Sequence, residues 1–341
     1  MKQGMSFMRG ILVIMVVFSF LLVLLMGRAE AGPDVFRVTL GTTSASSGMY
    51  PWLCAHAIEV NKRMKDIQIT AIESPNSTIE NGIRIYKGEM QMGWGGGSQT
   101  YRAFHGIGEF KGMANPDLRM AAYVAEVPFT FFAIKESGVK SLKELDGKKF
   151  GTGFPASQTG EISRRLFETM GIKPKFFEAA LGANIEAVKN RSIVGFAKTG
   201  APDSSILDIA AFQPINILGL TKEDFVKFEA KYPDYAESFS FIPARAYPGQ
   251  LEDIPTLCAP VGWQTTAKLP TDVVYKIVKA WYEARKDLAA MYAAANKERG
   301  ELGFPKLTLE IEKIPLHAGA CKFYKELGLS IPTKLIPPEA K

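Results

Sequence analysis

The stretch GTTSASSGMYPWLCAHAIEV, residues 41–60, follows a short strand-like run and opens a helical pattern. Leu53, Ala57 and Val60 recur at three- and four-residue steps, and Pro51 stands where a first helical turn tolerates proline, so an amphipathic helix is predicted. The glycines and hydroxyls before it then lie at a helix N-terminus, whose unpaired N–H groups and dipole can cradle an anion. The alternative is an ordinary strand-to-helix turn.

The first residues resemble an export signal. A basic start precedes a continuous apolar run, residues 11–26, which is followed by Ala29-Glu30-Ala31. This pattern predicts a signal peptide over residues 1–31, cleavage near Gly32 and an exported protein, with an uncleaved membrane anchor as the alternative.

Composition limits the class of the protein. The chain without residues 1–31 is long enough for about two domains. The formal net charge of the full sequence is +6, with acids and bases interspersed rather than clustered, so no nucleic-acid partner is expected. The three cysteines are widely spaced, which does not indicate a disulfide scaffold, although one pair could bridge.

Strand-like and helix-like stretches alternate along the chain, which predicts an α/β fold with two units. Separate strands are expected at residues 118–125 and 129–136, and one long helix over residues 271–295. Ser77 with Glu80 fits a capping box, so the Ser77 hydroxyl is expected to cap a helix rather than touch a ligand.

Four loops follow strand-like runs and lead into helices: residues 41–51, 93–101, 151–160 and 198–202. They are rich in Gly, Ser and Thr, and none contains Asp or Glu. In open α/β sheets such loops meet at the carboxyl ends of the strands, so an anionic ligand held by backbone N–H groups and neutral donors is predicted. The candidate contacts in these loops are Thr43, Ser47, Gly48, Tyr50, Trp94, Ser98, Gln99, Ser157, Gln158, Thr159, Lys198, Thr199 and Ala201.

Each of these side chains has a structural alternative. Trp94 and Tyr50 could be core aromatics, and Ser157 or Thr159 could cap a helix. Lys198 could be a solvated surface charge.

The sequence matches motifs of enzymes only weakly. The run GTGFPA formally fits a dinucleotide fingerprint, but Pro155 falls inside the turn and no acidic residue follows at the end of a clear second strand. The three histidines do not form a metal set. No cofactor, metal or catalytic residue is therefore expected.

Several segments together resemble the TAXI family of solute-binding proteins, which serve tripartite ATP-independent periplasmic (TRAP) transporters. SSGMYPW stands where that family has Gly-Thr-Tyr-Tyr-Pro, and residues 76–94 resemble its Gly-Ser-Val-Glu-Asn segment. GTGFPASQTG resembles its Gly-Ser-Gly-Thr loop, with Ser157 and Thr159 at the hydroxyl positions, and the late segments YPGQLEDIPTLCAPVG and HAGACKFYKELG match as well. GGGSQT and Gln158 depart from the family pattern, which puts a glutamate-type ligand in doubt.

The resemblance implies a two-lobed periplasmic binding protein, type II, that delivers a small organic acid or amino acid to a TRAP-type membrane permease. Residues 35–124 and 250–331 would form lobe one, and residues 125–249 lobe two. Glu126, close to the first crossing, would read the ammonium of an amino acid. The rival hypotheses are a secreted hydrolase or other enzyme acting on an anionic molecule in the same cleft, and a scaffold with no small ligand.

Overall fold

The computed structural model describes residues 35–153, 157–292 and 303–340. The chain divides into two compact units, residues 1–36 and 37–341, and the described elements lie almost entirely in the second. The predicted signal peptide and its cleavage point lie outside the described residues.

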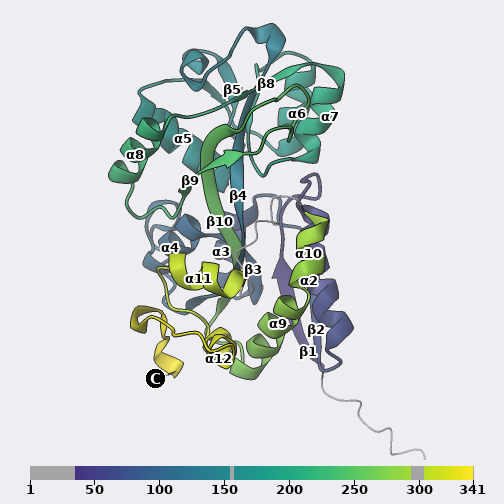
Figure 1. Ribbon diagram of the computed structural model, residues 1–341. Helices are drawn as coiled ribbons and strands as arrows, with labels where there is room; N and C mark the ends of the chain where they lie inside the picture. The colour runs from purple at the N-terminus through teal and green to yellow at the C-terminus, as the bar shows by residue number, and fades with distance from the viewer. Residues whose placement is uncertain (1–34, 154–156, 293–302, 341) are drawn as a thin grey trace, which may run out of the picture. The chain divides into compact units, whose positions relative to one another are not determined.

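The elements alternate as the sequence predicts (Figure 1). The strands are β1 (Phe36–Gly41), β2 (Ile67–Ile72), β3 (Met92–Gly96), β4 (Leu118–Ile134), β5 (Lys149–Gly151), β6 (Lys175–Phe177), β7 (Ala197–Thr199), β8 (Ile215–Leu218), β9 (Ser238–Ile242) and β10 (Ile254–Thr266). The α-helices are α2 (Tyr50–Arg63), α3 (Ser77–Tyr86), α4 (Gly97–His105), α5 (Gln158–Met170), α6 (Leu181–Lys189), α7 (Ser204–Phe212), α8 (Lys222–Lys231), α9 (Thr271–Glu283), α10 (Arg285–Met291), α11 (Phe304–Ile311) and α12 (Ala318–Glu326).

The main sheet is mixed. Its strands lie in the order β2-β1-β3-β10-β4-β7, with β8 paired to β4 and β9 paired to β10. β1 and β3 are parallel, whereas β10 is antiparallel to both β3 and β4. Strands β5 and β6 form a separate parallel pair. The α/β class predicted from the alternating pattern is therefore confirmed.

The prediction of two strands at residues 118–125 and 129–136 is wrong, because residues 118–134 form one 17-residue strand, β4. Pro128 lies inside this strand opposite Cys258 of β10, and the Pro128 carbonyl accepts a hydrogen bond from the Gly200 N–H at 2.7 Å. A proline lacks only the donor, so a strand can continue through it where that donor is not needed. Figure 1 shows β4 and β10 running side by side as an antiparallel pair.

The single long helix predicted over residues 271–295 is also wrong within the described part. Helix α9 ends before Ala284, and α10 begins after it. The predicted apolar face is nevertheless buried, at Val274, Ile277, Val278, Trp281 and Leu288. It packs on α2, where the Trp281 indole Nε1 donates to the His56 carbonyl at 3.1 Å.

Asn81 of α3 joins the ends of β1 and β3. Its Nδ2 donates to the carbonyls of Thr42 at 2.9 Å and Trp94 at 3.0 Å. A Cβ at Gly41 or Gly93 would collide with the Asn81 side chain, so both strands need glycine there. Asn81 thus connects the end of β1 with the middle of β3, next to the first two glycine-rich loops.

Two features are absent from the described part of the chain. No helix there is both long and apolar enough to cross a membrane. No disulfide joins the three cysteines, all of which are described.

Candidate functional site

A cavity of about 90 Å³ lies where the loops after β1, β5 and β7 come together. This volume has room for several water molecules or for one small organic molecule. Its described lining comes from widely separated parts of the chain: Thr43, Ser44, Ser47, Met49, Pro75, Ser77, Thr78, Trp94, Gly153, Ser157, Gln158, Thr159, Leu181, Asn184, Phe196, Ala197, Lys198, Thr199 and Val261.

Eight of the predicted contacts line this cavity: Thr43, Ser47, Trp94, Ser157, Gln158, Thr159, Lys198 and Thr199. Gly48, Tyr50, Ser98, Gln99, Glu126 and Ala201 do not belong to its described lining. Tyr50 is the first residue of α2, and Ala201 is buried next to a cis peptide bond with Pro202. Glu126 of β4 accepts a hydrogen bond from the Ser238 hydroxyl at 3.2 Å. All four predicted loops reach the cavity, the second through Trp94.

The loop between β1 and α2 folds as a chain of turns. The Ser47 N–H donates to the Ser44 carbonyl and the Tyr50 N–H to the Ser47 carbonyl, both at 2.9 Å. Met49 is the N-cap residue of α2 and its side chain makes no capping hydrogen bond, while Pro51 stands in the first turn as predicted. The first N–H groups of α2 and the positive end of its dipole are therefore not covered by the side chain of the N-cap residue.

The start of α3 also reaches the cavity, which corrects the prediction for Ser77. The N-cap is Asn76, and no side chain caps the helix. Ser77 lies inside the first turn with a positive φ of 56° and lines the cavity, although Glu80 does accept from the Asn76 N–H at 2.9 Å. Only half of the capping box forms, because the helix begins one residue earlier than the pattern suggested.

Thr78 is the most informative residue that the sequence pattern missed. Its side chain is 2% exposed, lines the cavity and leaves Oγ1 without a hydrogen-bond partner among the described residues. A buried hydroxyl without a partner costs free energy, so such a group at a cavity wall indicates a ligand or water partner.

The loop between β5 and α5 supplies hydroxyl and amide groups. Ser157 is the N-cap of α5, and its Oγ accepts from the Gly160 N–H at 3.1 Å, so the capping alternative for this residue is realised at the wall of the cavity. The Thr159 hydroxyl instead lies 2.7 Å from the Thr199 hydroxyl of β7. These two threonines join the loops after β5 and β7.

Lys198 is the one charged residue in the described lining of the cavity. Its Nζ donates to the Thr199 carbonyl at 2.9 Å and lies 3.5 Å from Oδ2 of Asp203. Asp203 is fully buried and caps α7 by accepting from the Ser205 N–H at 3.0 Å. The acid-free loop predicted at residues 198–202 thus ends directly before an acid that pairs with its lysine.

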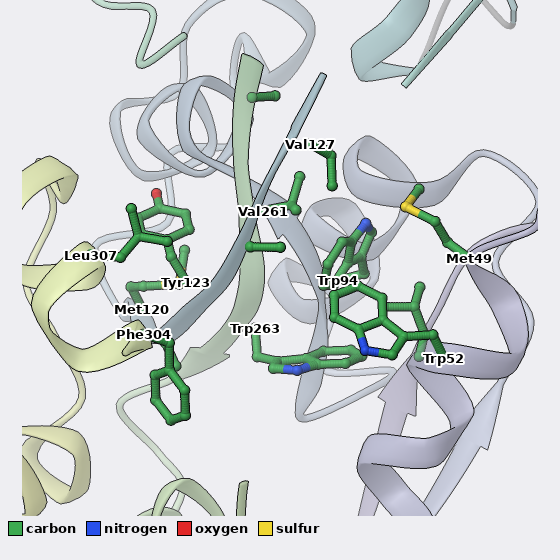
Figure 2. Close-up of a cluster of buried hydrophobic side chains, with 14 of the residues drawn as sticks. Met49, Trp52, Trp94, Met120, Tyr123, Val127, Val261, Trp263, Phe304 and Leu307 are labelled. Atoms are coloured by element: carbon green, nitrogen blue, oxygen red, sulfur yellow. The ribbon is translucent and has the colours of Figure 1, made fainter. Parts of the chain in front are cut away.

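Trp94 joins the cavity to the aromatic core. Its ring centroid lies 5.6 Å from that of Trp52 and 5.2 Å from that of Trp263, both nearly edge-on. Figure 2 shows these three indoles beside one another, with Met49 and Val261 nearby. Trp94 is 1% exposed and lines the cavity, so the core and the ligand interpretations of this residue are compatible.

Gln158 and Ser98 meet a buried acid, Glu237, that precedes β9. The Ser98 hydroxyl donates to Oε1 of Glu237 at 3.1 Å and the Gln158 Nε2 donates to it at 3.4 Å. Burial raises the pKa of Glu237 to about 7, against the opposing effect of these two hydrogen bonds. Gln158 also packs against Gly96, where a Cβ would collide with it.

A buried ion pair joins α4 to α5. Arg102 Nη1 donates to Oε1 of Glu161 at 2.6 Å, and the Tyr235 hydroxyl donates to the same oxygen. Burial alone would raise the pKa of Glu161, but Arg102, Tyr235 and Arg165 hold that pKa at about 2. The loop before α2 also approaches α7, because a Cβ at Gly48 would lie 2.7 Å from the Ser204 hydroxyl. Elements that precede β4 therefore contact elements that follow it in two places, at Arg102 with Glu161 and at Gly48 with Ser204.

Asn184 of α6 lines the cavity and was not predicted. Its Nδ2 donates to the carbonyls of Ala179 at 2.8 Å and Ala180 at 3.0 Å, which fixes the start of the helix. The sequence predicts a helix near Ile185, but no capping residue marked its start, because the N-cap of α6 is Ala180.

No group of three or more metal-ligating side chains lies in the described part of the chain. His56 is enclosed by aromatic rings, and burial lowers its pKa to about 4. His317 caps α12 by accepting from the Gly319 N–H at 3.0 Å.

Solved structures share this fold at low sequence identity. The chain is similar to a structure from work on glutathione import via GshT and the cystine ABC importer TcyBC of Streptococcus mutans, with a TM-score of 0.50, 10% identity and coverage of 78% of this chain and 98% of that one. The alkanesulfonate-binding protein SsuA from Xanthomonas axonopodis pv. citri, bound to MOPS, has a TM-score of 0.49 at 14% identity and covers 90% of this chain and 98% of its own.

The fold is that of type II periplasmic binding proteins, as the resemblance implied. The model of the NMT1-like family matches residues 40–328, which is most of the sequence. The chain therefore belongs to the NMT1-like family.

Proposed function

We propose that this protein is a solute receptor that captures a small organic anion in the cavity and hands it to a membrane permease. The observation that carries this proposal is the chemistry of the described lining, which combines eight hydroxyl side chains, two carboxamides and one lysine without any acidic side chain. Neutral hydrogen-bond donors in a cavity whose described lining has no acidic side chain suit a carboxylate.

Helix N-termini support the same ligand class. Residues from the first turns of α3 and α6 and the N-cap of α2 line the cavity, and the N-cap side chains of these helices, Met49, Asn76 and Ala180, make no capping hydrogen bond. Their first N–H groups have no intrahelical acceptor, and their dipoles favour negative charge. The unpartnered Thr78 hydroxyl adds a further donor at the same wall.

An organic acid suits this lining better than an amino acid. A buried ligand ammonium is usually paired with a carboxylate, but the described lining contains no acidic side chain, and Glu126, which was expected to supply one, is not part of it. We therefore propose a carboxylate ligand without an α-amino group.

Export, the partner and the two lobes belong to the same proposal. The apolar run at residues 11–26 with its Ala-x-Ala site supports a periplasmic receptor with a cleaved signal peptide. The TAXI-like segments support a TRAP-type permease as partner. Closure of the lobes at residues 35–124 with 250–331 and 125–249 would bury the ligand, and the Arg102–Glu161 pair is one contact that such closure would make.

The test uses Thr78→Val, which removes a hydroxyl that has no hydrogen-bond partner among the described residues. Affinity for the acids that bind the wild type should fall about tenfold to hundredfold, because a hydrogen bond to a charged group contributes about 1.5–3 kcal/mol. The free energy of unfolding of the ligand-free protein should stay the same or rise, since an unpaired buried polar group becomes a methyl group. Calorimetric titration with a panel of small carboxylic acids and amino acids, together with urea unfolding, measures both.

Thr265→Val is the matched control. Its hydroxyl donates to the Gln91 carbonyl at 2.9 Å and is not part of the described lining. This variant should lose about 1 kcal/mol of stability and keep its affinity. Equal affinity of Thr78→Val and wild type for every acid in the panel would count against the assigned cavity, and conversion of an acid seen by mass spectrometry would favour the enzyme hypothesis.

A further inference from the structure

The charge of Lys198 is already compensated. Its Nζ lies 3.5 Å from Oδ2 of Asp203, the Lys198 side chain is 11% exposed, and the Asp203 side chain is fully buried. Oδ2 has no hydrogen-bond partner among the described residues, whereas Oδ1 caps α7. Oδ1 of Asp203 thus stabilises the start of α7, and Oδ2 lies near the ammonium group of Lys198.

The remaining charges near the cavity also come in compensating sets. Arg102 is paired with Glu161 and Glu109. Glu237 accepts a hydrogen bond from Gln158, so the group behind this lining residue adds no positive charge. Among the described residues, no unpaired cation reaches the cavity.

The rest of the wall is apolar. Met49, Trp94, Leu181, Phe196 and Val261 all line the cavity, and Trp94 belongs to the buried indole cluster of Figure 2. The described lining therefore combines hydrogen-bond donors with hydrocarbon surface.

We propose that the ligand carries a single negative charge on an apolar body, as in a monocarboxylate, and that Asp203 is the residue that sets this limit by compensating Lys198. This inference rests on the proposed function and specifies its ligand class. One carboxylate is satisfied by helix N-termini and hydroxyl groups. A second carboxylate would be buried without a cation and close to the Asp203 carboxylate, which opposes it.

The test compares acids that share a skeleton and differ by one carboxylate: butanoate with succinate, pentanoate with glutarate, and benzoate with phthalate. Calorimetric titration of the purified wild-type protein should give dissociation constants at least about 100-fold lower for the monocarboxylate in the pair that fits best. Dicarboxylates that bind as tightly as their partners overturn the inference and leave the anion receptor standing. If no acid in either set binds, the proposed function itself fails.

Asp203→Asn tests the role of Asp203, because asparagine keeps an N-cap oxygen for α7 and removes the charge. The preference for monocarboxylates should fall at least tenfold, mainly through tighter binding of the dicarboxylates. Asp224→Asn is the matched control, since Asp224 is also a buried acid at a helix start, in the capping box of α8, and is not part of the described lining. An unchanged preference in Asp203→Asn overturns the role of Asp203. Asp203→Ser, which also keeps a capping oxygen, replaces this variant if it does not fold.

Discussion

Glu237→Gln should make the protein more stable at pH 8 and leave its stability at pH 4.5 nearly unchanged. The Glu237 side chain is buried, and its Oε1 accepts hydrogen bonds from Ser98 and Gln158. Its Oε2 has no hydrogen-bond partner among the described residues. A glutamine at this position keeps one acceptor oxygen and carries no charge to desolvate.

The size of the effect follows from the pKa of Glu237, which burial raises from the usual 4.5 to about 7. Between these two values the folded state binds more protons than the unfolded state, so wild-type stability falls as the pH rises through this window. Each unit of pKa corresponds to 1.36 kcal/mol, so the full loss is roughly 3 kcal/mol above pH 7. Below pH 4.5 both states are protonated, and the loss disappears.

Urea unfolding of wild type and Glu237→Gln at pH 4.5, 6 and 8 measures this difference directly. Glu312 is also buried with a pKa raised to about 7, but it is present in both proteins and cancels. Glu223→Gln is the control, because Glu223 is an exposed residue of α8 and should bring no gain at pH 8. A stability difference between Glu237→Gln and wild type that is the same at pH 4.5 and pH 8 would refute the reasoning.

Three further outcomes follow from the structure and sequence. Arg102→Met leaves the buried Glu161 without its main cation and should cost about 3–5 kcal/mol of unfolding free energy at pH 7 by urea titration; Arg102→Lys should recover part of it. Gly195→Ala should destabilise by about 3 kcal/mol or more by the same assay, because the added Cβ would meet the Phe132 carbonyl of β4; full wild-type stability would contradict this. Sequencing of the exported protein should find an N-terminus within a few residues of Gly32, and an intact start on a membrane-bound chain would rule that out.

Local sequence signals predicted the elements well where one physical rule dominated. Pro51 and the apolar spacing after it placed α2, and the glycine-rich runs placed the loops that reach the cavity. The same signals failed where neighbours decided the outcome. Proline often ends a strand, but β4 continues through Pro128, which lies opposite Cys258 of β10 and accepts a hydrogen bond from the Gly200 N–H.

The candidate site was predictable only in part. Thr43 and Thr159 were identified because they stand in acid-free loops, and both line the cavity. Thr78 and Asn184 were missed, because a hydroxyl inside a helix and an amide after an alanine cap carry no local signal. Asp203 was missed as a partner of Lys198, since their distance depends on how the loop after β7 turns into α7.

By itself, the sequence determined the alternation of strands and helices, the glycine-rich loops and the lack of acids in them, because periodicity, backbone freedom and charge act within a few residues of each other. Tertiary structure decided which loops share one cavity, that β4 and β10 run unbroken beside each other, and that Lys198 meets Asp203 while Gln158 meets Glu237. Those outcomes depend on burial and on contacts between residues far apart in the chain, which no local pattern encodes.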